Sequence, residues 1–268
     1  NTLDKNYLYL AEKLGARIIP ETEVVDVKRL DDGRYLLECR SSHGLIMKGK
    51  TFEAANVVFS GGVMGTVNLL LHCKETGNLP DLSDQLGNFT RTNSEAILGV
   101  ESMDRSTDWN DHIAITSGIY PDKNTHIEVV RYNKGSDVMY GLATVLTDGG
   151  GKIPRTLRFL GNILRHPLTF LRGLWLPGQS ARSSVILVMQ STENYIKLKK
   201  SGRGLASLLL ENGQRIPTYI PIANLVTRKM AEKMKGTAKG SWFEVLLDAP
   251  TTAHILGGCV LGETKEQG

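Results

Sequence analysis

A histidine that precedes two glycines is the arrangement in this sequence best suited to chemistry. His254 stands three residues ahead of the pair Gly257-Gly258. An imidazole accepts or releases a proton near neutral pH, so it can act as a general base or acid. Glycines have no Cβ atom, and the backbone can therefore pass close to a flat ligand while the ring points into a cavity. The alternative is a hydrogen-bonded core histidine without a catalytic role.

A second group of glycines follows a short apolar stretch at 57–59. Gly61, Gly62 and Gly65 lead into residues 67–73, which have the pattern of a helix. A strand, a glycine turn and a helix in this order are typical of a nucleotide-binding α/β unit, where free backbone N–H groups face the ligand. Alternatively, these glycines only let the helix pack close to the strand.

Two sets of elements must position these glycines and the histidine. In the first set, the residue pattern predicts a helix at 3–14 and strands at 16–20, 23–30, 34–40, 51–53 and 57–59, with a hairpin turn at 31–33. In the second, alternating apolar residues predict a mainly antiparallel sheet, with strands at 96–100, 113–119, 126–132, 185–190, 195–199 and 205–210. A helix is expected at 222–234.

Four stretches together resemble the glucose–methanol–choline family of oxidoreductases. The patterns G-A-x-I-I-P-x-T-x-V-x-x-V from residue 15 and A-A-x-V-V-x-x-G-G-x-x-G-T-x-x-L-L from residue 54 are similar to part of its FAD domain. Residues 86–93 resemble the L-G-x-x-x-x-x-N stretch that leaves this domain. Residues 251–262 resemble the H-P-L-G-G-C-x-x-G of the cholesterol-oxidase branch, with Ile255 in place of the proline.

This resemblance implies a role for each singled-out residue. His254 would hold, and deprotonate, a substrate hydroxyl while its α-hydrogen leaves as hydride to the flavin. The backbone of Val24 would lie against the adenine of FAD, and the expected cofactor-binding glycines are Gly61, Gly62, Gly65, Gly257 and Gly258. Glu193 is the candidate for a second catalytic carboxylate, although a glutamate at the end of a strand is more often solvated.

The expected fold class is α/β plus α+β. A partial Rossmann-like FAD- or NAD(P)-binding domain at 1–76 would precede a substrate domain, with a mainly antiparallel sheet, at 77–246. Residues 247–268 would return to the first domain with the His254 segment. No G-x-G-x-x-G, the fingerprint that holds a pyrophosphate, occurs in these residues. We therefore expect an internal fragment of a longer enzyme, which alone binds FAD weakly and does not turn over.

A basic and apolar segment at 154–176 suggests a membrane partner. Residues 149–192 contain six cations and no Asp or Glu, and Pro167 divides the segment into two short helices. Arginines toward anionic headgroups, with Phe159, Phe170 and Trp175 toward apolar substrate, would form an interfacial lid. The alternative is a pair of ordinary surface helices.

Composition narrows the remaining function classes. The chain is 41% apolar and 22% charged, typical of an ordinary globular protein. Three scattered cysteines predict no disulfide framework but buried or idle thiols, and no metal site is expected. Arginines between bulky aliphatic residues disfavour nucleic-acid binding. The localisation is unknown; a cytoplasmic or membrane-peripheral site is favoured, and secretion is not excluded.

Three functions are left open by the sequence. The leading one is oxidation of the CH–OH group of an apolar, sterol-like alcohol. The first alternative is a sugar or simple-alcohol dehydrogenase of the same family. The second is a catalytically inert fragment that binds substrate or lipid.

Overall fold

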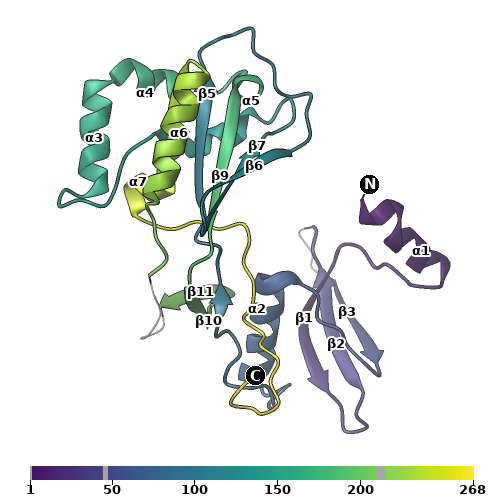
Figure 1. Ribbon diagram of the computed structural model, residues 1–268. Coiled ribbons are helices and arrows are strands. Elements are labelled where there is room, and N and C mark those ends of the chain that lie inside the picture. The colour runs from purple at the N-terminus through teal and green to yellow at the C-terminus, as the bar shows by residue number, and fades with distance from the viewer. Residues whose placement is uncertain (1, 45–47, 210–214) are drawn as a thin grey trace. The chain divides into compact units, whose positions relative to one another are not determined.

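The computed structural model describes residues 2–44, 48–209 and 215–268, which divide into two compact units (Figure 1). Unit 1 comprises Asn1–Asn88, Leu198–Leu208 and Gly258–Gly268, and unit 2 comprises Phe89–Lys197 and Leu209–Gly257. The boundaries expected at 76 and 246 therefore differ from those of the structure. Residues 77–88 belong to unit 1, and residues 247–257 belong to unit 2.

Unit 1 begins with two short helical segments, η1 (Leu3–Lys5) and α1 (Tyr7–Lys13). A three-stranded antiparallel sheet follows in the order β1-β2-β3, formed by Thr22–Arg29, Tyr35–Ser41 and Gly49–Ala54. The turn between β1 and β2 contains Gly33 at a φ of +85°, a left-handed conformation that favours glycine. Helix α2 (Gly62–Glu75) packs on β1 through Val67, Leu70 and Cys73, which share one helix face.

Two predicted strands of unit 1 are wrong. Residues 16–19 and 56–60 form neither helix nor strand, and the side chain of Val58 is 87% exposed. An apolar run becomes a strand only when a neighbouring backbone pairs with its N–H and C=O groups, and the described residues supply no such partner here. Every strand pairing given for the described residues is antiparallel. These residues form an α+β arrangement, without the parallel Rossmann-like sheet that was expected.

Unit 2 is built on a six-stranded antiparallel sheet of order β6-β7-β9-β5-β12-β8. Its strands are β5 (Ala96–Ser102), β6 (Ile115–Asp122), β7 (Thr125–Val130), β8 (Ala143–Val145), β9 (Ser183–Gln190) and β12 (Gly236–Ser241). Outside this sheet, β4 (Thr90–Arg91) pairs with the first two residues of β10 (Tyr195–Ser201), and β11 (Gly204–Leu209) lies almost wholly among the residues of unit 1. The strands predicted at 96–100, 113–119, 126–132 and 185–190 therefore belong to the antiparallel sheet, whereas those at 195–199 and 205–210 lie outside it and β8 and β12 were not predicted.

The helices of unit 2 are α3 (Arg155–Arg165), α4 (Pro167–Gly173), α5 (Gln179–Arg182), α6 (Pro221–Lys233) and α7 (Trp242–Leu247), together with η2 (Asp137–Leu142). In Figure 1, α6 lies along the sheet, and its contacts are with β5 and β12. Leu98 and Val100 belong to the apolar core that includes Ala223 of α6. The alternating residues Ile97 and Gly99 face the other side of the sheet.

Three further findings concern sequence expectations. Pro167 begins α4 directly after α3 ends at Arg165, as predicted. Cys39 and Cys73 are buried, but Cys259 is exposed, so its expected burial is wrong. None of the described helices is long and apolar enough to cross a membrane.

Candidate functional site

The segment that carries His254 is a loop after α7, and its backbone is fixed at Leu256. Leu256 donates its N–H to the carbonyl of Arg91 at 3.0 Å, and Arg91 donates to the carbonyl of Leu256 at 2.7 Å. This isolated antiparallel bridge joins the loop to β4 within unit 2. The histidine is therefore held two residues away from a point where the backbone is paired.

Gly257 occupies a position that a larger residue does not fit. Its φ is +91°, and a Cβ atom there would lie 2.4 Å from the carbonyl oxygen of Phe89. The left-handed backbone and the close approach each require glycine. Gly258 is also left-handed, at a φ of +81°, and belongs to unit 1, where its carbonyl accepts a hydrogen bond from Gly87.

The imidazole of His254 rests on polar residues that precede β5. Its Nδ1 lies 3.1 Å from Oε2 of Glu95 and 3.3 Å from Nδ2 of Asn93. The His254 side chain is 53% exposed, whereas that of Glu95 is 0% exposed. The ring thus has one nitrogen at a buried carboxylate and presents a half-exposed edge, an arrangement that can accept a proton from a ligand.

Sequence reasoning gave no role to Glu95. The available signal was a polar run, Asn93-Ser94-Glu95, directly before a strongly apolar strand. Asn93 was recognised only as the end of the stretch at 86–93. The pairing with His254 spans 159 residues of sequence, and only the tertiary fold brings these side chains together.

Glu193 lies apart from this group of contacts. Its carboxylate pairs with Nη1 of Arg91 at 3.0 Å, and its side chain is 82% exposed. Among the described residues, neither a hydrogen bond nor an ion pair joins it to His254. A solvated ion pair of this kind has a small energetic effect, and the catalytic role of Glu193 stays a prediction.

An apolar cavity of about 210 Å³ opens in unit 2 beside the sheet. It is lined by strand residues such as Ile97 and Gly99 and by the aromatic rings of Tyr132, Tyr140 and Phe243. Thr251, which lines it as well, leads into the His254 loop. Unit 2 therefore contains both an apolar space and a histidine suited to proton transfer.

Unit 1 has a larger cleft, of about 630 Å³, at the start of α2. Three of the residues expected to bind the cofactor, Val24, Gly61 and Gly65, line it, whereas Gly62 is not among the lining residues. Gly61 precedes the helix without a side-chain cap, so free N–H groups lie at this end of α2. The basic side chains Lys200 and Arg203 line the same cleft. Such a site suits the nucleotide part of a cofactor.

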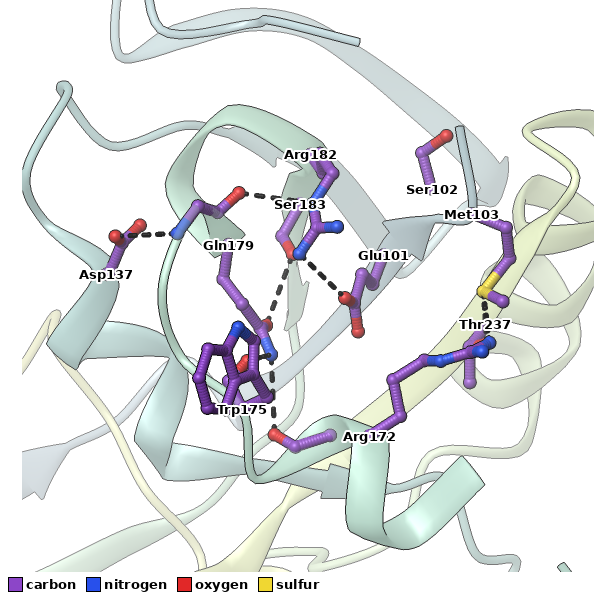
Figure 2. A network of polar contacts seen from close by, with 12 residues as sticks. Glu101, Ser102, Met103, Asp137, Arg172, Trp175, Gln179, Arg182, Ser183 and Thr237 are labelled. Atoms are coloured by element: carbon purple, nitrogen blue, oxygen red, sulfur yellow. Dashed lines mark hydrogen bonds and ion pairs between the residues drawn. The ribbon is translucent and has the colours of Figure 1, made fainter. Parts of the chain in front are cut away.

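Figure 2 shows a network of polar contacts in unit 2 that includes Glu101, Gln179 and Arg182. Glu101 of β5 pairs with Nζ of Lys239 at 2.8 Å and with Nη2 of Arg182 at 3.4 Å. The amide of Gln179 donates to the carbonyl of Trp175 at 2.9 Å. The Gln179 contact holds the backbone carbonyl of Trp175, whose side chain is strongly exposed.

Comparison with known proteins identifies relatives that match this chain along its whole length. A cholesterol oxidase of Acinetobacter baumannii is 39% identical over 278 aligned positions, which cover 100% of this chain and 50% of the relative. Cholesterol oxidases of two Mycobacterium tuberculosis strains, CDC 1551 / Oshkosh and ATCC 25618 / H37Rv, are 42% identical over 279 positions, covering 100% of this chain and 48% of each relative. The chain is related to the cholesterol oxidases.

This relationship confirms the resemblance that residues 16–73 and 251–262 predicted. The chain spans about half the length of the curated cholesterol oxidases it matches. No family model matches it. The sequence identities are averages over the whole alignment, so they assign no role to His254, Glu95 or the glycines.

Proposed function

We propose that this chain is part of an FAD-dependent oxidoreductase that oxidises the CH–OH group of an apolar, sterol-like alcohol. The observation that carries the proposal is the imidazole of His254, which is half exposed and rests on the buried carboxylate of Glu95. The apolar cavity of the same unit supports the choice of substrate, because its walls are mostly aliphatic and aromatic. The cholesterol oxidases to which the chain is related support the type of reaction.

The residues of unit 1 fit the nucleotide part of FAD. Val24, Gly61 and Gly65 offer backbone without bulky side chains beside the cleft, and Lys200 and Arg203 offer positive charge for a pyrophosphate. Bound FAD supplies the acceptor for the hydride of the alcohol. Gly62, Gly257 and Gly258 are proposed to lie near the same cofactor on the strength of the motifs alone.

Within unit 2, His254 orients the substrate hydroxyl and takes its proton. The ring nitrogen away from Glu95, Nε2, is the one available to a ligand. Loss of the hydroxyl proton raises the electron density on the carbinol oxygen and makes the α-hydrogen a better hydride donor. The aromatic walls exclude water and bind an apolar skeleton, which favours a sterol over a sugar.

The segment at 154–176 is proposed to contact membranes, where an apolar alcohol would be found. Large aliphatic side chains of α3 and α4 are exposed, among them Leu164 at 82% and Leu168 at 79%. They lie in the acid-free stretch that carries Arg158, Arg165 and Arg172. Phe159 takes no part, because it is buried and packs edge-on against Trp242 with ring centroids 5.6 Å apart.

Anaerobic flavin reduction in the protein of natural length tests the proposal. We expect a dispersed sterol to reduce the flavin much faster than a sugar, and His254→Gln to slow the reaction by about 100-fold or more, as loss of a general base does. Faster reduction by the sugar would instead support a sugar or simple-alcohol dehydrogenase. Reduction by neither alcohol would support an inert fragment that binds lipid.

A further inference from the structure

The carboxylate of Glu95 is buried and only partly hydrogen-bonded, which lowers the free energy of unfolding relative to an apolar side chain. Its side chain is 0% exposed, and its Oε1 atom has no hydrogen-bond partner among the described residues. An unpaired polar atom in the interior costs free energy, and an apolar side chain of similar size would avoid that cost. A costly buried group next to a half-exposed histidine points to a functional reason for its presence.

All donors around Glu95 converge on its other oxygen, Oε2. The N–H of Ala253 lies at 2.9 Å, Nδ1 of His254 at 3.1 Å and the hydroxyl of Thr252 at 3.4 Å. A backbone N–H can only donate, so Oε2 is an acceptor in that contact, and an ionised carboxylate is an acceptor in all of them. The proton shared with the imidazole then belongs to Nδ1.

Asn93 offers a competing arrangement, because its Nδ2 lies 3.3 Å from the same Nδ1. If that amide donated to Nδ1, the ring proton would be on Nε2. The hydroxyl of Thr252 would also have to donate its single proton to two acceptors, Asn93 Oδ1 at 3.0 Å and Glu95 Oε2. Exchanging the oxygen and nitrogen positions of the Asn93 amide removes the competing donor to Nδ1 and the double demand on the Thr252 proton. Thr252 then accepts from Asn93 and donates to Glu95, and Nδ1 keeps its proton.

We propose that Glu95 is a positioning residue that holds His254 in the tautomer protonated at Nδ1 and leaves the Nε2 lone pair free for the substrate hydroxyl. This role rests on the proposed function. The hydroxyl O–H bond breaks and its proton passes to Nε2. The carbinol C–H bond breaks as a hydride leaves to the flavin, and the C=O bond forms. The imidazolium that results keeps its Nδ1–H at the carboxylate, which stabilises the positive charge.

The wild-type tautomer is the first test. In the protein of natural length, labelled with ¹⁵N in histidine and assigned with His254→Gln, we expect the His254 nitrogen signals of a neutral ring protonated at Nδ1. Glu95→Leu, which has a similar size but no acceptor, should shift these signals toward the Nε2-protonated form, because Nδ1 then loses its acceptor and the Asn93 amide at 3.3 Å can donate to it. A wild-type ring protonated at Nε2 would overturn the inference without any variant.

The rate of anaerobic flavin reduction by the alcohol is the second test. We expect Glu95→Leu to lower the limiting rate by on the order of 100-fold or more, with little change in the substrate concentration at half-saturation. Glu101→Gln controls for the loss of a buried carboxylate charge, since Glu101 is a buried carboxylate on the strand that Glu95 precedes, ion-paired to Lys239 instead of His254. It should retain the wild-type rate, and circular dichroism confirms that each variant is folded.

The outcomes distinguish a failure of the positioning role of Glu95 from a failure of the proposed alcohol oxidation. If the wild type reduces its flavin and His254→Gln does not, the proposed function stands. If Glu95→Leu then equals the wild type in rate and tautomer, the positioning role alone is refuted. If no alcohol reduces the wild-type flavin, the proposed function fails, whereas the tautomer signals still report whether Glu95 orients the ring.

Discussion

At the residue scale, the site depends on a few side chains whose surroundings limit what can replace them. His254 has its partners in a polar run ahead of β5, and Gly257 passes under the carbonyl of Phe89. The contacts of His254 determine which of its ring nitrogens carries a proton. The close approach to Phe89 leaves no room for a side chain at Gly257. The proposed proton transfer and the stability of the fold therefore depend on the same loop, and single substitutions can test each of them separately.

Gly257→Ala should destabilise unit 2. The substitution forces an L-residue into a left-handed backbone and places a methyl group 2.4 Å from the oxygen of Phe89. We expect a loss of about 1–3 kcal/mol in the free energy of unfolding, measured by urea denaturation. Gly135→Ala is the matched control, because its φ of +89° is similar and nothing lies within 4 Å of the added methyl group. Equal losses would show that the close approach to Phe89 has no effect.

Glu244 should make stability fall as pH rises. Burial raises the pKa of Glu244 to about 7, although the guanidinium of Arg155 at 3.2 Å lowers it in part. The folded value lies above the ordinary value of 4.5. Between these two pH values the folded state keeps a proton that the unfolded state releases. Its free energy of unfolding therefore decreases as pH increases through this window.

The measurement is the free energy of unfolding at several pH values between about 4.5 and about 7, in the wild type and in Glu244→Gln. The variant cannot titrate at this position, and its stability should depend less steeply on pH. Arg155 keeps its bonds to the carbonyls of Thr147 and Thr218 in this variant. Glu232→Gln, at an exposed position of α6, serves as the control and should follow the wild type.

At the element scale, α3 and α4 combine a packed inner side with an exposed apolar outer side. Their inner side is packed, since Phe159, Phe170 and Trp242 form an edge-on aromatic cluster. Their outer side exposes leucines among arginines, without acidic side chains. An apolar surface rimmed with cations is typical of a helix that lies in a membrane interface.

Replacing Leu164 and Leu168 together by serine should weaken binding to anionic vesicles. Each exposed leucine would bury apolar area in the bilayer, so the pair should change vesicle affinity by about 10-fold or more. Co-sedimentation with vesicles of anionic phospholipid measures the effect. Leu225→Ser, at an exposed leucine of α6, is the control and should bind like the wild type. A wild-type protein that stays in the supernatant would refute the membrane proposal.

At the scale of the whole molecule, cofactor binding is predicted for unit 1, and substrate binding with proton transfer is predicted for unit 2. The cleft that suits a nucleotide lies in unit 1, and the apolar cavity and His254 lie in unit 2. The chain matches about half of each related cholesterol oxidase. The proposed reaction needs both the nucleotide and the substrate, so it is expected only of the assembled protein.

This chain produced by itself should bind FAD weakly. Its residues include the cleft at α2 but no G-x-G-x-x-G that would hold the pyrophosphate. We expect purification without the visible absorbance of flavin, and a titration with FAD that quenches flavin fluorescence only slightly. The protein of natural length, prepared in parallel, should retain its flavin. Stoichiometric flavin in the shorter chain would contradict this prediction.

Local signals in the sequence determined much of the structure. The turn at 31–33 predicted the β1–β2 hairpin, and the break at Pro167 predicted the separate helices α3 and α4. Alternating apolar residues predicted β5, β6, β7 and β9 of the antiparallel sheet, because the side-chain period of a strand is a local property, but not β8 and β12. The motif around His254 identified the relationship to the cholesterol oxidases, since a motif is a property of adjacent residues.

Only the tertiary structure decided what depends on distant partners. Residues 57–59 are apolar enough for a strand, yet they form none, because a strand requires a paired neighbour and not composition alone. Phe159 was expected to face substrate, but packing against Trp242 buries it. The placement of Glu95 against His254, across 159 residues, follows from the path of β5 and the Leu256 bridge. Contacts of this kind arise when the chain folds back on itself, and no local pattern encodes them.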